Sequence, residues 1–168
     1  MDNVKKITSN IEDYLEAIFR IEDNRGIVRV KEISQVLGVT YPSTSGILKK
    51  MESMGLVEHE RYGYVKLTDE GGRVARDIIR REQVLCRFFK DVLLIDDDKA
   101  VKHACRMEHF MDDSTTHRLE KLTAMLLDNQ YGPFLGKFHK ILEHSEAEEV
   151  LAPPVTIGAK PSDNAAVK

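Results

Sequence analysis

The stretch that decides the fold spans residues 38 to 55 and reads GVTYPSTSGILKKMESMG. Within it, Thr40 is placed to cap a helix whose first turn contains Pro42. Proline is tolerated there because the first N–H groups of a helix have no partner inside the helix. Leu48 and Met51 recur at helical spacing and predict a buried stripe. We therefore expect a helix that follows a tight turn and ends at Gly55.

The flanking segments extend this helix into a larger motif. A short helix through Ile33 and Leu37 ends at Gly38, so helix, tight turn and helix follow one another, as in a helix-turn-helix. Residues 56–61 and 64–67 are strand-like and predict a hairpin. With one helix before these elements, the order describes a winged helix-turn-helix domain, which we place at residues 1–72.

That earlier helix carries two acids on a face of their own. Ser9 and Glu12 have the spacing of a capping box and predict the helix start. Asp13 and Glu16 lie one turn apart, away from the apolar stripe. Such a pair is either a solvated acidic surface or two oxygen ligands for a cation.

The remainder of the chain is helical in pattern, so the fold class is mostly α. We expect an all-helical domain at residues 73–145 and a flexible tail at residues 146–168, where Pro153 and Pro154 interrupt a sequence without periodicity. The apolar stripe after residue 75 is too wide for one layer of helices to cover, which favours dimerisation. Its members include Phe88, Phe89, Val92 and Leu93.

Composition excludes several classes of protein. The chain has 168 residues, 42% hydrophobic and 32% charged, and no apolar run of the length that a membrane span needs. Two cysteines are too few for a disulfide framework and favour reduced thiols in a cytoplasm. The net charge of −3 provides no global attraction to nucleic acid. Residues 91–130 hold nine acids against five bases, together with Cys and His, which indicates a cation-binding region.

The sharpest local signal is Cys105, Glu108 and His109. Positions i, i+3 and i+4 share one helix face, so a thiol, a carboxylate and an imidazole gather where a divalent metal could bind. The alternative is a half-buried cysteine beside a surface Glu–His pair. Glu82 and Cys86 also share a helix face and are equally ambiguous.

A second group of residues predicts DNA binding. Small hydroxyl side chains near a helix start can enter a major groove, and lysines further along can contact phosphates. The alternative is a winged helix that only docks proteins. The predicted DNA-contacting residues are Thr40, Pro42, Ser43, Thr44, Ser45, Lys49, Lys50 and Arg61.

Two other functional classes compete with a metal-dependent regulator. An enzyme with Cys105 as nucleophile and His109 as base lacks oxyanion donors within one helical turn, so we expect no enzyme. A winged-helix regulator of a small organic ligand remains the rival. It predicts a ligand pocket in place of converging acids, and DNA binding that chelators do not affect.

Five blocks of sequence together resemble the diphtheria toxin repressor family of metal-dependent transcriptional regulators, especially its short manganese-transport-regulator branch. They are residues 10–18 (NIEDYLEAI), 42–45 (PSTS), 55–57 (GLV), 67–71 (LTDEG) and 104–109 (ACRMEH). The resemblance implies a homodimer that binds palindromic operator DNA and represses genes of metal homeostasis. It also implies metal sites between the first helix and the helical domain.

Carried over residue by residue, the resemblance assigns a ligand set. Asp13 and Glu16 match ligands of the first helix, and Cys105, Glu108 and His109 match the metal-binding helix. Carboxylates favour Mn²⁺ and a thiolate favours softer ions, so the expected cofactor is Fe²⁺ or Mn²⁺. The sixth expected ligand is Glu82, at a position where the family usually has a histidine.

Converging carboxylates also repel one another. We expect this repulsion to keep the first helix loosely docked until a cation binds between the two domains.

Overall fold

The structure is a computed structural model that describes residues 7–59 and 63–145. Within these residues the elements are α1 (Ser9–Arg25), β1 (Val28–Arg29), α2 (Val30–Leu37), α3 (Tyr41–Ser53), β2 (Val57–His59), β3 (Tyr64–Leu67), α4 (Asp69–Arg87), a π-helix (Phe88–Val92), α5 (Asp97–Met107), a 3-10 turn (Glu108–Phe110), α6 (Asp113–Leu126) and α7 (Gly132–Ser145). The fold is mostly α, as expected. No described helix is both long enough and apolar enough to cross a membrane.

The N-terminal half is the expected winged helix-turn-helix. Helix α2 ends at Gly38, whose φ of 65° is the left-handed conformation that favours glycine, and the side chain of Thr40 accepts a hydrogen bond from the Ser43 N–H. Strand β3 lies between β1 and β2 and is antiparallel to both. One core joins these elements, and Leu15, Ile18 and Leu48 are among its fully buried members.

The start of α1 differs from the prediction. The N-cap residue is Thr8 rather than Ser9, and its side chain makes no capping hydrogen bond. The predicted capping box is therefore wrong, and the Glu12 side chain is directed to other partners, described below. The buried stripe of α1 is confirmed at Ile11 and Leu15.

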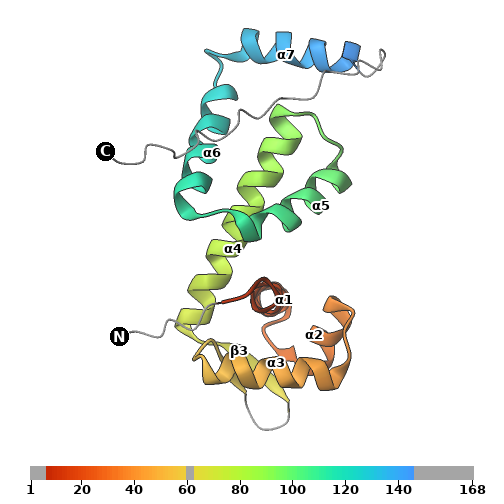
Figure 1. The fold of residues 1–168 in the computed structure, drawn as a ribbon, viewed down its shortest axis with the longest axis vertical. Helices are drawn as coiled ribbons and strands as arrows, with labels where there is room; N and C mark the ends of the chain where they lie inside the picture. The colour runs from red at the N-terminus through yellow and green to blue at the C-terminus, as the bar shows by residue number, and fades with distance from the viewer. Residues whose placement is uncertain (1–6, 60–62, 146–168) are drawn as a thin grey trace, which may run out of the picture.

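Helix α4 connects the two halves of the molecule (Figure 1). Its N-cap Thr68 accepts a hydrogen bond from the Gly71 N–H and donates one to the Gly55 carbonyl. A Cβ at Gly71 would lie 1.9 Å from the carbonyl oxygen of Leu56, so the close contact between α4 and the wing requires glycine here. The predicted boundary after residue 72 falls inside this continuous helix and stays a prediction.

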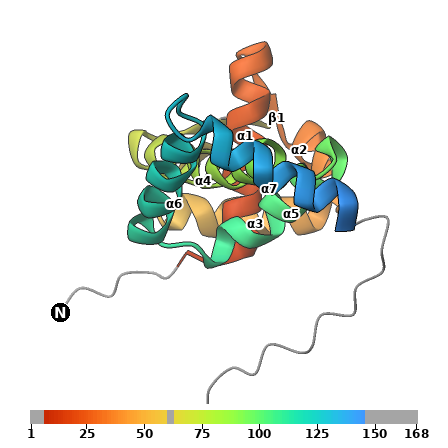
Figure 2. The same cartoon turned by 90° about the horizontal axis from the view of Figure 1, so that it is seen from above.

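The C-terminal half has a smaller core. Its buried residues are Leu85, Phe89, Ala100 and Ala104, from α4, the π-helix and α5. Phe89 and Val92, two members of the predicted apolar stripe, are buried within the chain itself and so are covered without a partner. Figure 2 shows α7 lying across this half when the molecule is seen from above. The predicted tail, residues 146–168, lies outside the described residues.

Candidate metal centre and DNA-binding face

The candidate metal centre lies where α1, α4 and the turn after α5 meet. Figure 1 shows α1 end-on beside α4, between the two halves. At this junction Glu108 is fully buried, and neither of its carboxylate oxygens has a hydrogen-bond partner. An unpaired buried carboxylate is costly, because burial disfavours the charged form and no donor compensates for the lost water.

His109 contacts three carboxylates at this junction. Its Nε2 atom lies 3.1 Å from Asp13 Oδ1, and its Nδ1 atom lies 2.8 Å from Glu12 Oε2 and 3.3 Å from Glu108 Oε1. Glu12 is itself held by Arg81, at 2.8 Å. With Nδ1 bonded to Glu12, Nε2 beside Asp13 is the nitrogen that could hold a metal ion, an arrangement often found for metal-binding histidines.

The surroundings of Glu108 and His109 shift the pKa values of both side chains. Burial raises the pKa of Glu108 to about 7, and the nearby Glu16 carboxylate adds to the shift, although His109 and Arg81 oppose it. Burial alone would lower the pKa of His109, but the hydrogen bond to Glu12 and the charges of Glu108 and Asp13 outweigh it, so this pKa is raised. A metal ion that binds here would have to displace any proton that either group holds, so metal binding at this junction depends on pH.

Cys105 lies in the last turn of α5, one helical turn before Glu108. Its side chain is exposed, and partial desolvation followed by the charges of Glu16 and Glu82 raises the pKa of its thiol. The thiol therefore senses the charges of the same cluster. The triad as a set of metal ligands stays a prediction, and α5 ends at Met107, so Glu108 begins a 3-10 turn.

Glu16 and Glu82 share a different partner. Arg20 donates from Nε to Glu16 Oε1 at 2.8 Å and also pairs with Glu82. Burial raises the pKa of Glu82, against the opposing charge of Arg20. The predicted mutual repulsion of the carboxylates is thus offset by the guanidinium groups of Arg20 on α1 and Arg81 on α4. Helix α1 packs against α4.

The donor set fits a divalent cation, although the geometry is not that of a closed site. No three His, Cys, Asp or Glu side chains in the described ranges already stand in metal-binding arrangement. Several of the carboxylates are instead paired with arginine or histidine. The fit rests on Glu108, a buried carboxylate without a hydrogen-bond partner, next to an imidazole, a carboxylate and a thiol of the types that bind Fe²⁺ and Mn²⁺.

Sequence reasoning missed three residues of the cluster: Glu12, Arg20 and Arg81. A signal existed for Arg20, because it stands four residues after Glu16 on one helix and such pairs are common. No local pattern connects Glu12 with a residue 97 positions away. Cys86 is partly buried and packs against the C-terminal core.

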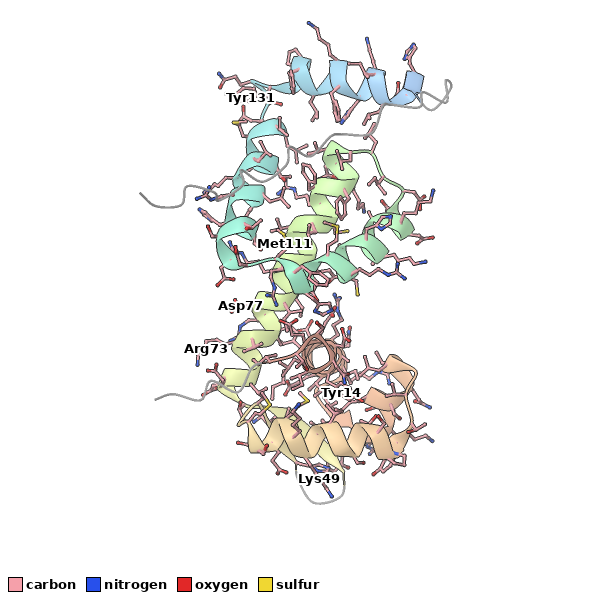
Figure 3. All side chains as sticks on the ribbon, in the orientation of Figure 1. Tyr14, Lys49, Arg73, Asp77, Met111 and Tyr131 are labelled. Atoms are coloured by element: carbon pink, nitrogen blue, oxygen red, sulfur yellow. The ribbon has the colours of Figure 1, made fainter. Side chains whose placement is uncertain are left out.

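The DNA-binding face predicted on α3 is mostly accessible. Thr40, Pro42, Ser43, Lys49 and Lys50 are exposed and Ser45 is half-buried. Figure 3 shows Lys49 directed away from the body of the molecule.

Two of the predicted contacts differ from the rest. Thr44 is fully buried and donates its hydroxyl to the Thr40 carbonyl, so it cannot reach DNA and its assignment is corrected. Arg61 lies outside the described residues.

A winged helix-turn-helix that shares its first helix with a carboxylate–imidazole–thiol cluster defines the class of metal-responsive DNA-binding regulators. Comparison with known families specifies this further. The chain belongs to the iron-dependent repressor family: residues 6–65 match the family's N-terminal DNA-binding domain, and residues 68–133 match its metal-binding and dimerisation domain. The predicted family is confirmed.

Individual relatives agree. The chain is 28% identical over 123 residues to the HTH-type transcriptional regulator MntR of Shouchella clausii, covering 73% of this chain and 85% of that protein. It is 31% identical over 138 residues to the diphtheria toxin repressor of Corynebacterium glutamicum, covering 80% and 60%.

A solved structure is also similar. A manganese-dependent transcriptional repressor in complex with manganese matches with a TM-score of 0.62 and 29% identity, over 67% of this chain. The match covers 52% of that structure, so this chain corresponds to about half of its length.

Proposed function

We propose that this chain is a metal-activated transcriptional repressor that binds palindromic operator DNA as a homodimer when loaded with Fe²⁺ or Mn²⁺, and so controls metal homeostasis in the cytoplasm. The observation that carries the proposal is the buried carboxylate of Glu108, which has no hydrogen-bond partner and lies beside His109, itself in contact with Asp13. Members of the family are transcriptional regulators, and we assign this chain no enzymatic activity.

The proposed ligands are Asp13, Cys105, Glu108 and His109. Glu16 and Glu82 stand at the edge of the site in contact with Arg20. A bound divalent ion would supply positive charge to the buried carboxylates and favour the thiolate and the neutral imidazole. The mixture of hard oxygen ligands and one thiol supports Fe²⁺ or Mn²⁺ without separating them.

Helix α1 connects this site to DNA binding. One face of α1 is buried in the winged-helix core through Leu15 and Ile18, while Asp13 faces His109. A metal ion held by Asp13 and His109 would therefore fix the winged helix relative to the helical half. In a dimer this fixes the spacing of the two α3 helices, which a palindromic operator can match. Metal and DNA must then strengthen each other's binding equally, by about 1–3 kcal/mol in typical cases.

Exposed apolar side chains support the homodimer. On α6 and α7, Leu122, Met125, Phe134 and Ile141 are each more than two-fifths exposed. Apolar patches of this kind mark association surfaces. We propose that they contribute to the dimer interface in place of Phe89 and Val92.

To test the proposal, an operator is first selected from random-sequence duplexes with the Mn²⁺-loaded protein. The affinity of the protein for this operator is then measured by fluorescence anisotropy with MnCl₂ and with EDTA. We expect chelation to weaken binding at least tenfold, and Mn²⁺ to restore it. Equal affinity in both conditions would refute the mechanism and favour the organic-ligand regulator. Repeating the titration anaerobically with Fe²⁺ compares the two metals.

A further inference from the structure

We propose that Arg20 is a fixed cation within the metal centre, so that each subunit binds one divalent ion rather than two. The inference rests on the proposed function, since it concerns the stoichiometry of the same site. Arg20 lies on α1, one turn after Glu16, and its guanidinium group bridges Glu16 on α1 and Glu82 on α4.

The bridged carboxylates have little contact with solvent. The side chains of Glu16 and Glu82 are 14% and 13% exposed, whereas that of Arg20 is 49% exposed. The stem of Arg20 therefore reaches in from the surface and places its charged end between two largely desolvated carboxylates. Charge-assisted hydrogen bonds of this kind are strong and orient both partners.

The cluster thus has two parts that differ in whether a cation already neutralises their carboxylates. Neither oxygen of Glu108 has a hydrogen-bond partner, and Oε1 lies 3.3 Å from His109 Nδ1, which is already bonded to Glu12, so an incoming cation would relieve a poorly compensated charge there. Glu16 and Glu82 already share a cation, and a metal ion could use both of them only by displacing a guanidinium group held by two carboxylates. The position at Glu108 therefore favours metal binding, whereas the position between Glu16 and Glu82 disfavours it.

The test compares the full-length wild type with Arg20→Met, which removes the charge and keeps much of the apolar stem. Isothermal titration with MnCl₂ gives the number of ions per subunit, and native mass spectrometry counts them independently. We expect one Mn²⁺ per subunit in the wild type and two in Arg20→Met. Circular dichroism confirms that the variant is folded.

Two further variants make the result specific. Arg80→Met removes an arginine that pairs with Glu120 elsewhere on α4, and it should keep one ion per subunit. Arg20→Met combined with Glu82→Gln removes the carboxylate that the second ion would use, and it should return the count from two to one.

The outcomes separate this inference from the proposed function. Two ions in the wild type, or one in both the wild type and Arg20→Met, would overturn the role of Arg20 and leave the repressor proposal standing. No Mn²⁺ binding by the wild type would overturn both.

Discussion

The two halves of the molecule differ in how completely they bury their apolar residues. In the described part of the N-terminal half, fifteen buried residues from α1 to α4 form one core that includes the wing. In the C-terminal half the corresponding core has four buried residues, and large apolar side chains such as Phe134 and Ile141 remain more than half exposed. The first half is a closed unit, whereas the second is built to be completed by a partner, which fits its match to a dimerisation domain.

The largest expected effect comes from breaking the closed core. Leu15 is fully buried on α1, so Leu15→Ala should lower the free energy of unfolding by about 2–5 kcal/mol, through lost burial and the cavity left behind. Leu122, 43% exposed on α6, is the matched site in the other half. Leu122→Ala should change the unfolding free energy of the isolated subunit by less than about 0.5 kcal/mol. Urea unfolding at low protein concentration measures both.

The same pair of variants tests the open surface. Sedimentation equilibrium should show a weakened dimer for Leu122→Ala, with a dissociation constant raised about tenfold, corresponding to about 1.4 kcal/mol. A dimer that dissociates as in the wild type would remove Leu122 from the interface.

The second prediction concerns the junction between the halves and its pH dependence. The pKa of Glu108 in the folded chain is about 7, against a usual value near 4.5. Because the pKa of Glu108 is raised in the folded chain, the folded state binds its proton more tightly than the unfolded state. The stability that protonated Glu108 contributes is fully present below about pH 4.5 and is lost as the pH rises through about 7. In EDTA the free energy of unfolding of the wild type should therefore fall across this window.

Glu108→Gln removes the charge and keeps the shape of the side chain. At pH 8 in EDTA we expect the variant to be more stable than the wild type by about 1–3 kcal/mol, because the wild type then buries an ionised carboxylate whereas the amide carries no charge. At pH 5 the two proteins should differ little. Glu108 and His109 interact, so the difference belongs to the pair. Parallel profiles of unfolding free energy against pH in the wild type and the variant would contradict a buried, poorly compensated carboxylate at Glu108. Mn²⁺ binding should be lost in the variant.

The elements of the N-terminal half could largely be predicted because local signals and tertiary packing agree there. Thr40, Pro42 and Gly38 mark helix ends whatever the rest of the chain does. Thr44 is the residue of α3 that was wrongly predicted to contact DNA. Its spacing to Leu48 and Met51 already places it on the buried stripe of the helix. Its small hydroxyl side chain is equally suited to a groove or to a helix carbonyl, and here it bonds to the Thr40 carbonyl.

The candidate site was predictable in its residue types and less so in its pairings. Asp13, Glu108 and His109 meet as expected. Glu12, by contrast, fits a capping box in the sequence, and the choice between that role and a contact with His109 depends on how α1 packs against the turn after α5. Helical periodicity defines faces of one helix, and it carries no information on which distant residue a face meets.

The third prediction sharpens the functional division between the halves. Lys49 is exposed on α3 and directed away from the body of the molecule (Figure 3). Lys49→Ala should weaken binding to all DNA sequences alike and reduce the slope of log K against log salt by about one, as expected for a lost phosphate contact. Mn²⁺ affinity of the DNA-free protein should be unchanged. Lys102→Ala, at an exposed position on α5, is the control and should leave the slope as it is.

The last prediction concerns metal preference, where the expected effect is a reordering rather than a loss. If the Cys105 thiolate binds the metal, Cys105→Glu makes the site entirely oxygen and imidazole. Mn²⁺ should then gain relative to Fe²⁺ and Co²⁺, and Zn²⁺ and Cd²⁺ should lose most. Because Cys105 is exposed, the larger side chain should not disturb the core.

A Co²⁺ titration provides the spectroscopic evidence. A thiolate ligand gives a charge-transfer band in the near ultraviolet, so the wild type should show this band and Cys105→Glu should not. The alternative is a cysteine that lies beside the site without binding the ion. That alternative predicts no band in the wild type and an unchanged ranking of metals in the variant, and it would leave Asp13, Glu108 and His109 as the ligands. The raised pKa of the thiol adds a second check, because metal binding through the thiolate must release its proton, and the affinity of the wild type should rise more steeply with pH than that of the variant.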